Sequence, residues 1–406
     1  MFSPERRDPF VLADLSDSIF RDGGSLFANM GFEHRPEQEL MARMCSEAFE
    51  TDSPLVFEAG TGVGKSLAYL IPGIIAAKRF RRQLVVATNT IALQEQLLRK
   101  DLPLVRLLFS RDSNLAEFAD FKTAFLVGRA NYLCTSRLKR AIAEKTELFR
   151  TDESAELERI AEWALCTKTG MVEELNPRPN WDVWNWVNAD SSSCSPKKCP
   201  DGTCFYQKAR KAVAGADVVI LNHSLLFALI AAGAAEEIGT RGVLFADDMC
   251  VIDEAHLMPK VAAESFGLSI SSSGMAKELR RIYDPLKKRG LITRAPSASV
   301  FEKESVVAAL AAVENFFAKI RKENLVKKDT VRLASPEWTA NTLEEPLSIL
   351  AKNLSAIAAR TQDESLSSEI KDYQRKVCAM KDAVAEAVYL GAEKHVYWLE
   401  KGGKDG

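Results

Sequence analysis

Residues 59–66 read AGTGVGKS, and residues 251–256 read VIDEAH. The first stretch matches the phosphate-loop pattern G-x-x-x-x-G-K-[ST], except that Ala59 replaces the first glycine. The glycines let backbone N–H groups turn toward a polyphosphate, and the N-terminus of a following helix adds a favourable dipole. An accidental glycine-rich turn is the alternative, but a short apolar run precedes the motif and a helical pattern follows it. We expect nucleotide contacts from Gly60, Thr61, Gly62, Gly64, Lys65 and Ser66.

The two stretches together predict nucleotide hydrolysis. Lys65 is expected to reach the β- and γ-phosphates, and the Ser66 hydroxyl to bind Mg²⁺. Asp253 follows a short apolar run and is predicted to hold the Mg²⁺ through water, while Glu254 deprotonates the attacking water. Alone, the acidic stretch is a weak signal, because a strand that ends in a solvated acidic turn gives the same letters. Downstream of a phosphate loop, it predicts Lys65, Asp253 and Glu254 as the catalytic set.

The pattern around these motifs predicts an α/β fold with a parallel, doubly wound sheet. Short apolar runs expected to form strands alternate with helical patterns at residues 67–77 and 92–100. An amphipathic helix at residues 153–166 lies in a stretch without sheet periodicity, and a long helical pattern follows His256. The expected strands are residues 54–58, 83–88, 122–127, 218–221 and 251–252. The expected domains are residues 1–128 with 208–257, an insertion at 129–207, a helical region at 258–395 and a flexible tail at 396–406.

The composition is that of an ordinary globular protein. Of 406 residues, 47% are apolar and 27% charged, which excludes a disordered or fibrous chain. Lys and Arg number 54 and Asp and Glu 56, so a bulk electrostatic attraction to nucleic acid is not evident. The N-terminus lacks the apolar run of a signal peptide, and Asn222 and His223 interrupt the longest apolar stretch. We predict a cytoplasmic chain without a membrane partner.

Four cysteines form a candidate metal site. Cys194, Cys199 and Cys204 have the spacing C-x4-C-x4-C, and Cys134 lies upstream. Four thiolates suit an iron–sulfur cluster or zinc, and the spacing alone does not choose between them. Unrelated free thiols are the third interpretation. Cys166 is expected to be buried on the apolar side of its helix.

Several motifs resemble those of the iron–sulfur superfamily 2 DNA helicases, the XPD/DinG group, and point to its bacterial DinG/YoaA branch. Besides the phosphate loop, the DEAH sequence and the four cysteines, five segments carry this resemblance. They are RPEQ at 35–38, TNTIALQEQL at 88–97, GRANYLC at 128–134, CFYQKARKAVAGADVVILNHSLLF at 204–227 and FGLSISSS at 266–273.

The resemblance implies a RecA-like P-loop NTPase domain with an iron–sulfur cluster insertion and an α-helical arch domain. It implies ATP as substrate with Mg²⁺, Arg35 and Gln38 on the adenine side, and 5′→3′ translocation on single-stranded DNA. Forked or displaced-strand DNA is the expected wider substrate. The implied ligands of a [4Fe–4S] cluster are Cys134, Cys194, Cys199 and Cys204.

Other side chains have weaker assignments. Arg129, Asn131, Tyr132, Lys197 and Lys198 are candidate DNA contacts, with a solvated basic loop as the alternative. The basic run at residues 78–82 is expected to be a solvated helix end. Three tryptophans, Trp181, Trp184 and Trp186, are expected to form a small satellite core.

Motifs of the family's second RecA-like domain, which carries the arginine finger, are not found in these 406 residues. The sequence therefore predicts the N-terminal motor half of a helicase, with a separately encoded second RecA-like domain as a candidate partner. Two other interpretations stay open. One is an ATP- and DNA-binding or redox-responsive module without autonomous helicase activity, and the other is a zinc-containing, nucleotide-binding structural protein.

Overall fold

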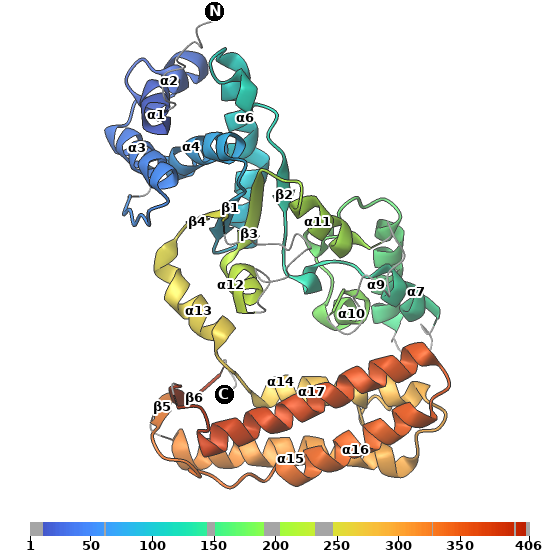
Figure 1. Ribbon diagram of the computed structural model, residues 1–406. Coiled ribbons are helices and arrows are strands. Elements are labelled where there is room, and N and C mark those ends of the chain that lie inside the picture. The colour runs from blue at the N-terminus through green and yellow to red at the C-terminus, as the bar shows by residue number, and fades with distance from the viewer. Residues whose placement is uncertain are drawn as a thin grey trace, which may run out of the picture. The chain divides into compact units, whose positions relative to one another are not determined.

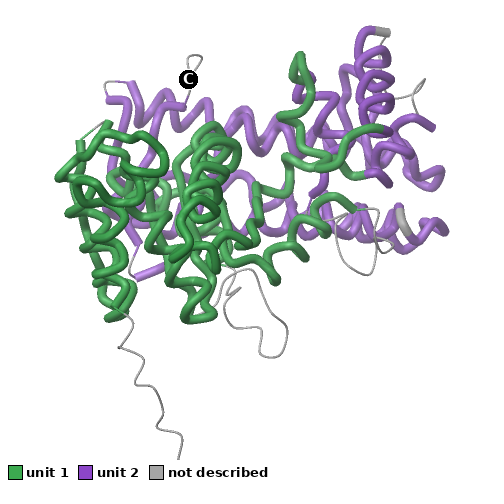
Figure 2. The backbone as a smooth tube through the Cα atoms, turned by 90° about the horizontal axis from the view of Figure 1, so that it is seen from above, with its two compact units in different colours: residues 1–134, 166–178, 200–267 green, residues 135–165, 179–199, 268–406 purple. Residues whose placement is uncertain are grey.

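The computed structural model describes residues 11–60, 62–143, 151–190, 204–231, 247–326, 328–393 and 395–402. The chain divides into two compact units, coloured separately in Figure 2. Unit 1 comprises residues 1–134, 166–178 and 200–267, and unit 2 comprises residues 135–165, 179–199 and 268–406. The stretch expected as a single insertion, residues 129–207, is thus shared between the two units.

A four-stranded parallel sheet organises unit 1 (Figure 1), as the alternating pattern predicted. Its order is β2-β3-β1-β4, so strands distant in sequence are neighbours in the sheet. All five residues of β1 are buried, which is typical of a central strand in a parallel sheet covered on both faces. The strands are β1 (Leu84–Thr88), β2 (Thr123–Phe125), β3 (Val218–Asn222) and β4 (Met249–Ile252).

The strand expected at residues 54–58 is wrong, because this segment has no regular secondary structure. Leu55 and Phe57 pack against the core of unit 1, whereas Val56 is 96% exposed. The side chains therefore alternate as in a strand, but the backbone joins no ladder of the sheet. The apolar run anchors the chain just before the phosphate loop.

Helix α4 (Lys65–Phe80) is the centre of the unit 1 core. It is longer than the predicted helix and continues through Pro72, and every residue from Leu67 to Ala77 is buried. A helix that is apolar all round must be covered on all sides. The other helices of unit 1 are α1 (Leu12–Phe20), α2 (Ser25–Met30), α3 (Pro36–Thr51), α5 (Ile91–Gln96), α6 (Leu102–Arg111), α11 (Phe205–Val213), α12 (His223–Ala231) and α13 (Met258–Phe266). A π-helical turn, η1 (Leu97–Asp101), joins α5 to α6, and 3-10 turns lie at Ala116–Phe118, Arg129–Asn131, Val172–Glu174 and Ala255–Leu257.

Unit 2 is largely helical, as the sequence predicted for the residues after 258, and it has its own core. The long helix α15 (Val300–Asn324) begins with a capping box in which Ser299 and Glu302 satisfy each other's backbone N–H groups. The remaining helices are α7 (Thr135–Ala143), α9 (Thr151–Ala164), α10 (Trp181–Val187), α14 (Ser272–Ile282), η6 (Leu291–Arg294), α16 (Glu344–Arg360) and α17 (Glu364–Tyr389). No helix among the described residues is long and apolar enough to span a membrane.

The end of the chain differs from the flexible tail expected at residues 396–406. Strand β6 (Tyr397–Glu400) pairs antiparallel with β5 (Thr330–Leu333). Leu399 packs against the unit 2 core, whereas Glu400 faces solvent. The alternating side chains of this short strand were too few to identify it from sequence.

This strand can be tested by substitution. Leu399→Ala is expected to lower the free energy of unfolding by about 1 kcal/mol, because apolar contacts with the core are lost. Glu400→Ala, on the exposed face, should change it by less than about 0.5 kcal/mol. Thermal unfolding of both variants checks the assignment, and a neutral Leu399→Ala would support a flexible tail instead.

Candidate functional site

The phosphate loop curls at two glycines before α4 begins. Gly62 and Gly64 have φ values of 84° and 87°, a left-handed region that glycine adopts without strain. A Cβ on Gly64 would also lie 2.2 Å from Nε2 of Gln38, so a side chain at this position would displace the Gln38 amide. Ala59, at the altered first position of the motif, packs against the unit 1 core. Thr61 lies outside the described residues.

Lys65 and Glu254 form an ion pair across the candidate site. Nζ of Lys65 lies 3.1 Å from Oε1 of Glu254, and both side chains are about one-third exposed. Glu254 has a φ of 55°, which is uncommon for a residue with a side chain and typical of constrained functional positions. The structure therefore brings together two of the three predicted catalytic residues.

Asp253 lies at the same edge, directly after β4. Its backbone N–H donates to the carbonyl of Ala87 at 2.9 Å, which extends the ladder with β1 by one residue. Its carboxylate accepts hydrogen bonds from the Glu254 backbone N–H at 3.0 Å and from the Tyr69 hydroxyl at 3.3 Å. The catalytic set predicted from sequence is thus assembled at the carboxyl end of the parallel strands, where such sheets bind ligands.

Two buried side chains, Tyr69 and His223, contact Asp253. Neither was identified from sequence. Tyr69 is 2% exposed. Burial raises the pKa of Tyr69 well above its ordinary value, and the charge of Asp253 adds to the rise. His223 is fully buried, and its Nε2 lies 2.8 Å from the carbonyl oxygen of Asp253. Tyr69 follows Lys65 by one helical turn, a spacing that could have identified it.

Asp101, in the π-helical turn η1, is a further buried carboxylate at this site. Asp101 is 7% exposed. Burial raises the pKa of Asp101, and the nearby Ser66 hydroxyl acts in the opposite direction. Its Oδ2 atom has no hydrogen-bond partner among the described residues. π-Helical turns are often found at functional sites, but the sequence gives no signal for one here.

These side chains form a donor set that fits Mg²⁺. The hydroxyl of Ser66 and the carboxylates of Asp253 and Asp101 are hard oxygen ligands of the kind that Mg²⁺ prefers. The Oδ2 atom of Asp101 is buried without a hydrogen-bond partner among the described residues. A bound cation would compensate the free-energy cost of burying this charge. Ser66 and Asp253 are the ligands expected from sequence, and Asp101 is an addition.

Arg35 and Gln38, predicted on the adenine side, contact the phosphate loop itself. The guanidinium of Arg35 donates to the carbonyl oxygen of Gly62, and Nε2 of Gln38 donates to that of Gly64 at 2.9 Å. These bonds tie the start of α3 to the loop. Both residues therefore lie at the candidate nucleotide site.

Two of the four candidate cluster cysteines lie within the described residues. Cys134 and Cys204 are 6% and 8% exposed. Their neighbours pack together, because the rings of Tyr132 and Tyr206 have centroids 5.6 Å apart. Cys194 and Cys199 lie outside the described residues, so the grouping of all four stays a prediction. Among the residues that are described, no three His, Cys, Asp or Glu side chains form a metal-binding group.

Three expectations about nearby side chains need correction. Cys166 is exposed rather than buried, because α9 ends at Ala164, before it. Tyr132 is 1% exposed, so its side chain cannot face DNA. Trp181 is 55% exposed, whereas Trp184 is fully buried against Trp163, so the tryptophan core is smaller than expected.

Two of the other candidate DNA-contacting residues, Arg129 and Asn131, interact with neighbouring residues of the protein. The guanidinium of Arg129 lies 5.0 Å from the ring centroid of Tyr206, and the Asn131 side chain donates to the Gly128 carbonyl. Lys197 and Lys198 lie outside the described residues. In the basic run at residues 78–82, Lys78 pairs with Asp120 at 2.7 Å and Arg82 with Asp52 at 2.8 Å, as expected of a solvated helix end.

The buried charge of Asp101 leads to a test of stability. In buffer without Mg²⁺ or nucleotide, Asp101→Asn is expected to raise the free energy of unfolding by about 0.5–1 kcal/mol, because a poorly compensated buried charge is removed. Asp22→Asn, in an exposed turn, is the matched control and should be neutral. Denaturant unfolding measures both, and a destabilised Asp101→Asn would contradict this view of the carboxylate.

Comparisons with known proteins agree with these motifs. A family profile described as DEAD_2 matches residues 111–275. The chain is 33% identical over 280 residues to the ATP-dependent DNA helicase YoaA of Haemophilus influenzae, covering 68% of this chain and 40% of that protein. It is 36% identical over 275 residues to the ATP-dependent helicase DinG of Mycobacterium tuberculosis, covering 64% and 40%.

A third relative covers more of the chain. The 3'-5' exonuclease DinG of Bacillus subtilis is 27% identical over 351 residues, which are 86% of this chain and 35% of that protein. The chain thus spans about 40% or less of the length of these relatives. A solved structure titled Truncated XPD covers 85% of the chain at 14% identity, with a TM-score of 0.36, which is too low to bear on the fold.

Proposed function

Since this chain is of the XPD/DinG helicase type, we propose that it is the ATP-hydrolysing motor portion of an ATP-dependent DNA helicase. The proposed motor moves 5′→3′ along single-stranded DNA, with forked or displaced-strand DNA as its substrate. The observation that supports this most is the convergence of Lys65, Asp253 and Glu254 at one edge of the sheet. The relatives are longer than this chain, and the segments that match it are 40% or less of their length, so the complete activity is proposed for a larger assembly that includes a second RecA-like domain.

Each residue has a role that follows from its position. The backbone N–H groups at the N-terminus of α4 and the ammonium of Lys65 hold the phosphates. Ser66 and Asp253 hold Mg²⁺, which, when bound, offsets the negative charge of the phosphates. Glu254 accepts the proton of the attacking water. Because Lys65 pairs with Glu254, the arriving polyphosphate has to replace that carboxylate as the partner of Lys65.

Two substitutions separate binding from hydrolysis. Lys65→Ala is expected to weaken ATP binding at least about tenfold, because the phosphates lose a charged partner. Glu254→Gln is expected to reduce hydrolysis by about 10²-fold or more, because the base is lost while the metal ligands stay. Fluorescent-nucleotide binding and phosphate release measure the two effects, and wild-type hydrolysis by Glu254→Gln would contradict the assignment of the base.

The same proposal predicts slow hydrolysis by the 406-residue chain alone. An arginine finger contributes about 10³–10⁵ in rate in well-studied phosphoryl-transfer systems, and the family's finger lies in the second RecA-like domain. Adding that domain as a separate chain should restore hydrolysis that single-stranded DNA stimulates. Robust unwinding of duplex DNA by this chain alone would refute the proposal that a second RecA-like domain is required.

We further propose a [4Fe–4S] cluster held by Cys134, Cys194, Cys199 and Cys204. The close packing of Tyr132 on Tyr206 supports it, because these residues flank the first and the last of the four cysteines. Residues 129–207 are then the cluster insertion of the motor, and residues 258–395 its helical arch. Bound cluster iron would give the purified protein visible absorption.

Substitution of cysteines tests the cluster. Cys199→Ser is expected to remove the visible absorption together with the bound iron and sulfide, whereas Cys166→Ser, at an exposed position, should leave all three unchanged. Metal analysis of anaerobically purified protein is the measurement. A colourless protein with stoichiometric zinc would contradict the cluster and favour a zinc site.

A further inference from the structure

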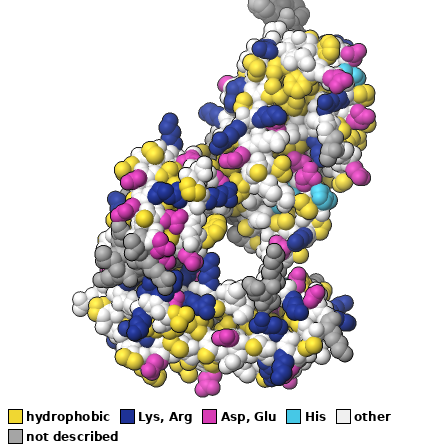
Figure 3. All heavy atoms as spheres, turned by 180° about the vertical axis from the view of Figure 1, so that it is seen from behind, with side chains coloured by type: hydrophobic (Ala, Val, Ile, Leu, Met, Phe, Trp, Pro, Cys, Tyr) yellow, Lys and Arg dark blue, Asp and Glu magenta, His cyan; other side chains and the backbone are white. Residues whose placement is uncertain are grey.

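Unit 2 contains a cavity of about 610 Å³ that no motif predicted. It is lined by residues of α7, α10, α14, η6 and α17 and of the turn at residues 284–289. Eight Arg and Lys side chains line it, against three carboxylates. This strongly basic cavity contrasts with the mixed surface in Figure 3, where basic and acidic side chains are interspersed. Cavities of this size hold small ligands in many proteins.

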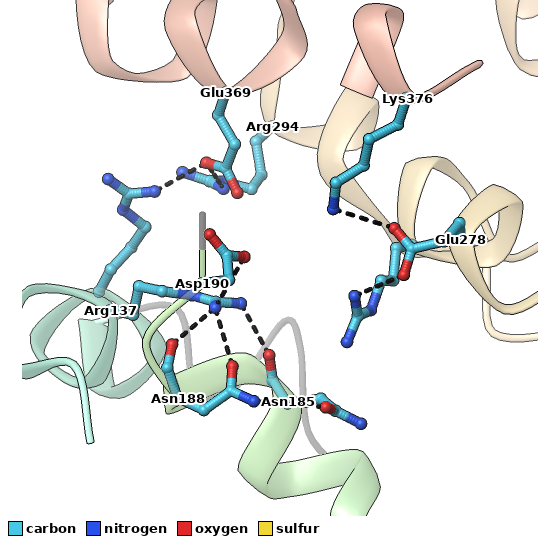
Figure 4. Close-up of polar contacts among 10 residues, drawn as sticks. Arg137, Asn185, Asn188, Asp190, Glu278, Arg294, Glu369 and Lys376 are labelled. Atoms are coloured by element: carbon cyan, nitrogen blue, oxygen red, sulfur yellow. Dashed lines mark hydrogen bonds and ion pairs between the residues drawn. The ribbon is translucent and has the colours of Figure 1, made fainter. Parts of the chain in front are cut away.

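The cavity wall holds its cations in place by sharing carboxylates. Glu369 of α17 pairs with Arg140 at 2.8 Å and with Arg294 at 3.1 Å (Figure 4). The shared pairing therefore holds both guanidinium groups in place on the cavity wall.

Two further carboxylates behind the wall repeat this arrangement. Glu278 pairs with Arg281 at 2.7 Å and with Lys376 at 3.1 Å (Figure 4). Glu153 pairs with Arg289 at 3.3 Å and with Lys287 at 3.7 Å. Asp284, on the lining, accepts hydrogen bonds from the backbone N–H groups of Leu286 and Lys287 and so stabilises its own turn.

Arg137 makes this corner of the cavity rigid. Its guanidinium donates to the carbonyl oxygens of Asn185 and Asn188, each at 2.7 Å, and pairs with Asp190 at 3.0 Å (Figure 4). A guanidinium held by several acceptors cannot turn away from the cavity. The wall is therefore organised before any ligand arrives.

Lys277 and Arg280 also line the cavity, and neither forms an ion pair with a carboxylate among the described residues. They lie three positions apart on α14, so they share a face of that helix, and both are exposed. Trp186 and Tyr373 add two aromatic rings to the lining. Trp186 is half-buried.

We propose that this cavity is a second phosphate-binding site, separate from the phosphate loop, for a compact ligand that carries several phosphates and a planar base. Arg guanidinium groups match phosphate oxygens in geometry, and an indole ring can stack on a base. The same chemistry is offered by a free nucleoside polyphosphate and by the phosphorylated 5′ end of a nucleic acid strand. The proposal does not depend on helicase activity.

The experiment uses the full chain with Lys65→Ala, so that the phosphate loop does not contribute. Inorganic tripolyphosphate and a short single-stranded oligonucleotide, with and without a 5′-phosphate, are the probes in calorimetric titrations. Lys277→Gln with Arg280→Gln is expected to weaken tripolyphosphate binding about tenfold, because two charge-assisted contacts are lost. Lys319→Gln, at an exposed position on α15 that does not line the cavity, is the control and should change it less than about twofold.

The two probes distinguish the source of the phosphates. Cavity-dependent preference for the 5′-phosphorylated oligonucleotide over the 5′-hydroxyl form identifies a strand end. Cavity-dependent binding of tripolyphosphate alone identifies a free polyphosphate compound. Tripolyphosphate affinity that is the same in the double variant and in the Lys319→Gln control would overturn the proposal. Lys277→Arg combined with Arg280→Gln keeps one of the two positive charges, so this variant should bind tripolyphosphate more tightly than the variant with both Gln substitutions. A merely structural effect would not predict this recovery.

Discussion

The pairing of β4 with β1 is the constraint on which the candidate site depends. It continues one residue beyond the strand, where the backbone N–H of Asp253 donates to the Ala87 carbonyl. This register sets Asp253 and Glu254 at the carboxyl edge of the sheet, beside the helix that starts at Lys65. Their contacts join residues 184 and 189 positions apart in sequence. A slip of one residue would turn the Asp253 carboxylate to the other face of the sheet, away from Tyr69.

Much of this arrangement was predictable, because segments with a strong apolar pattern indicate their own secondary structure. The buried strands at residues 84–88 and 218–222 and the helix after the phosphate loop follow from apolar runs and glycine placement. Weaker sequence patterns led to wrong or missing predictions. Residues 54–58 have the composition of a strand but no ladder partner. Asp101 and His223 could not be identified, because a π-helical turn and a buried histidine depend on tertiary packing that a local pattern does not encode.

The charge distribution explains why composition said little about binding. The chain as a whole has a net charge of -2, yet one cavity in unit 2 is lined by eight cations and three carboxylates. Local excess arises because residues from α7, η6, α14 and α17, far apart in sequence, meet around Glu369 and Glu278. The two units therefore each carry a candidate phosphate site of different construction. One uses backbone N–H groups and a single lysine, and the other uses guanidinium groups held by shared carboxylates.

The central claim is that Glu254 is the ion-pair partner of Lys65 and that the nucleotide phosphates displace it when they bind. Equilibrium binding of a non-hydrolysable ATP analogue, compared between the wild type and Glu254→Gln, tests this most directly. Neutralising Glu254 removes the competing partner of Lys65, so the account predicts that the variant binds the analogue more tightly, by about three- to tenfold. Weaker binding by Glu254→Gln than by the wild type would contradict it.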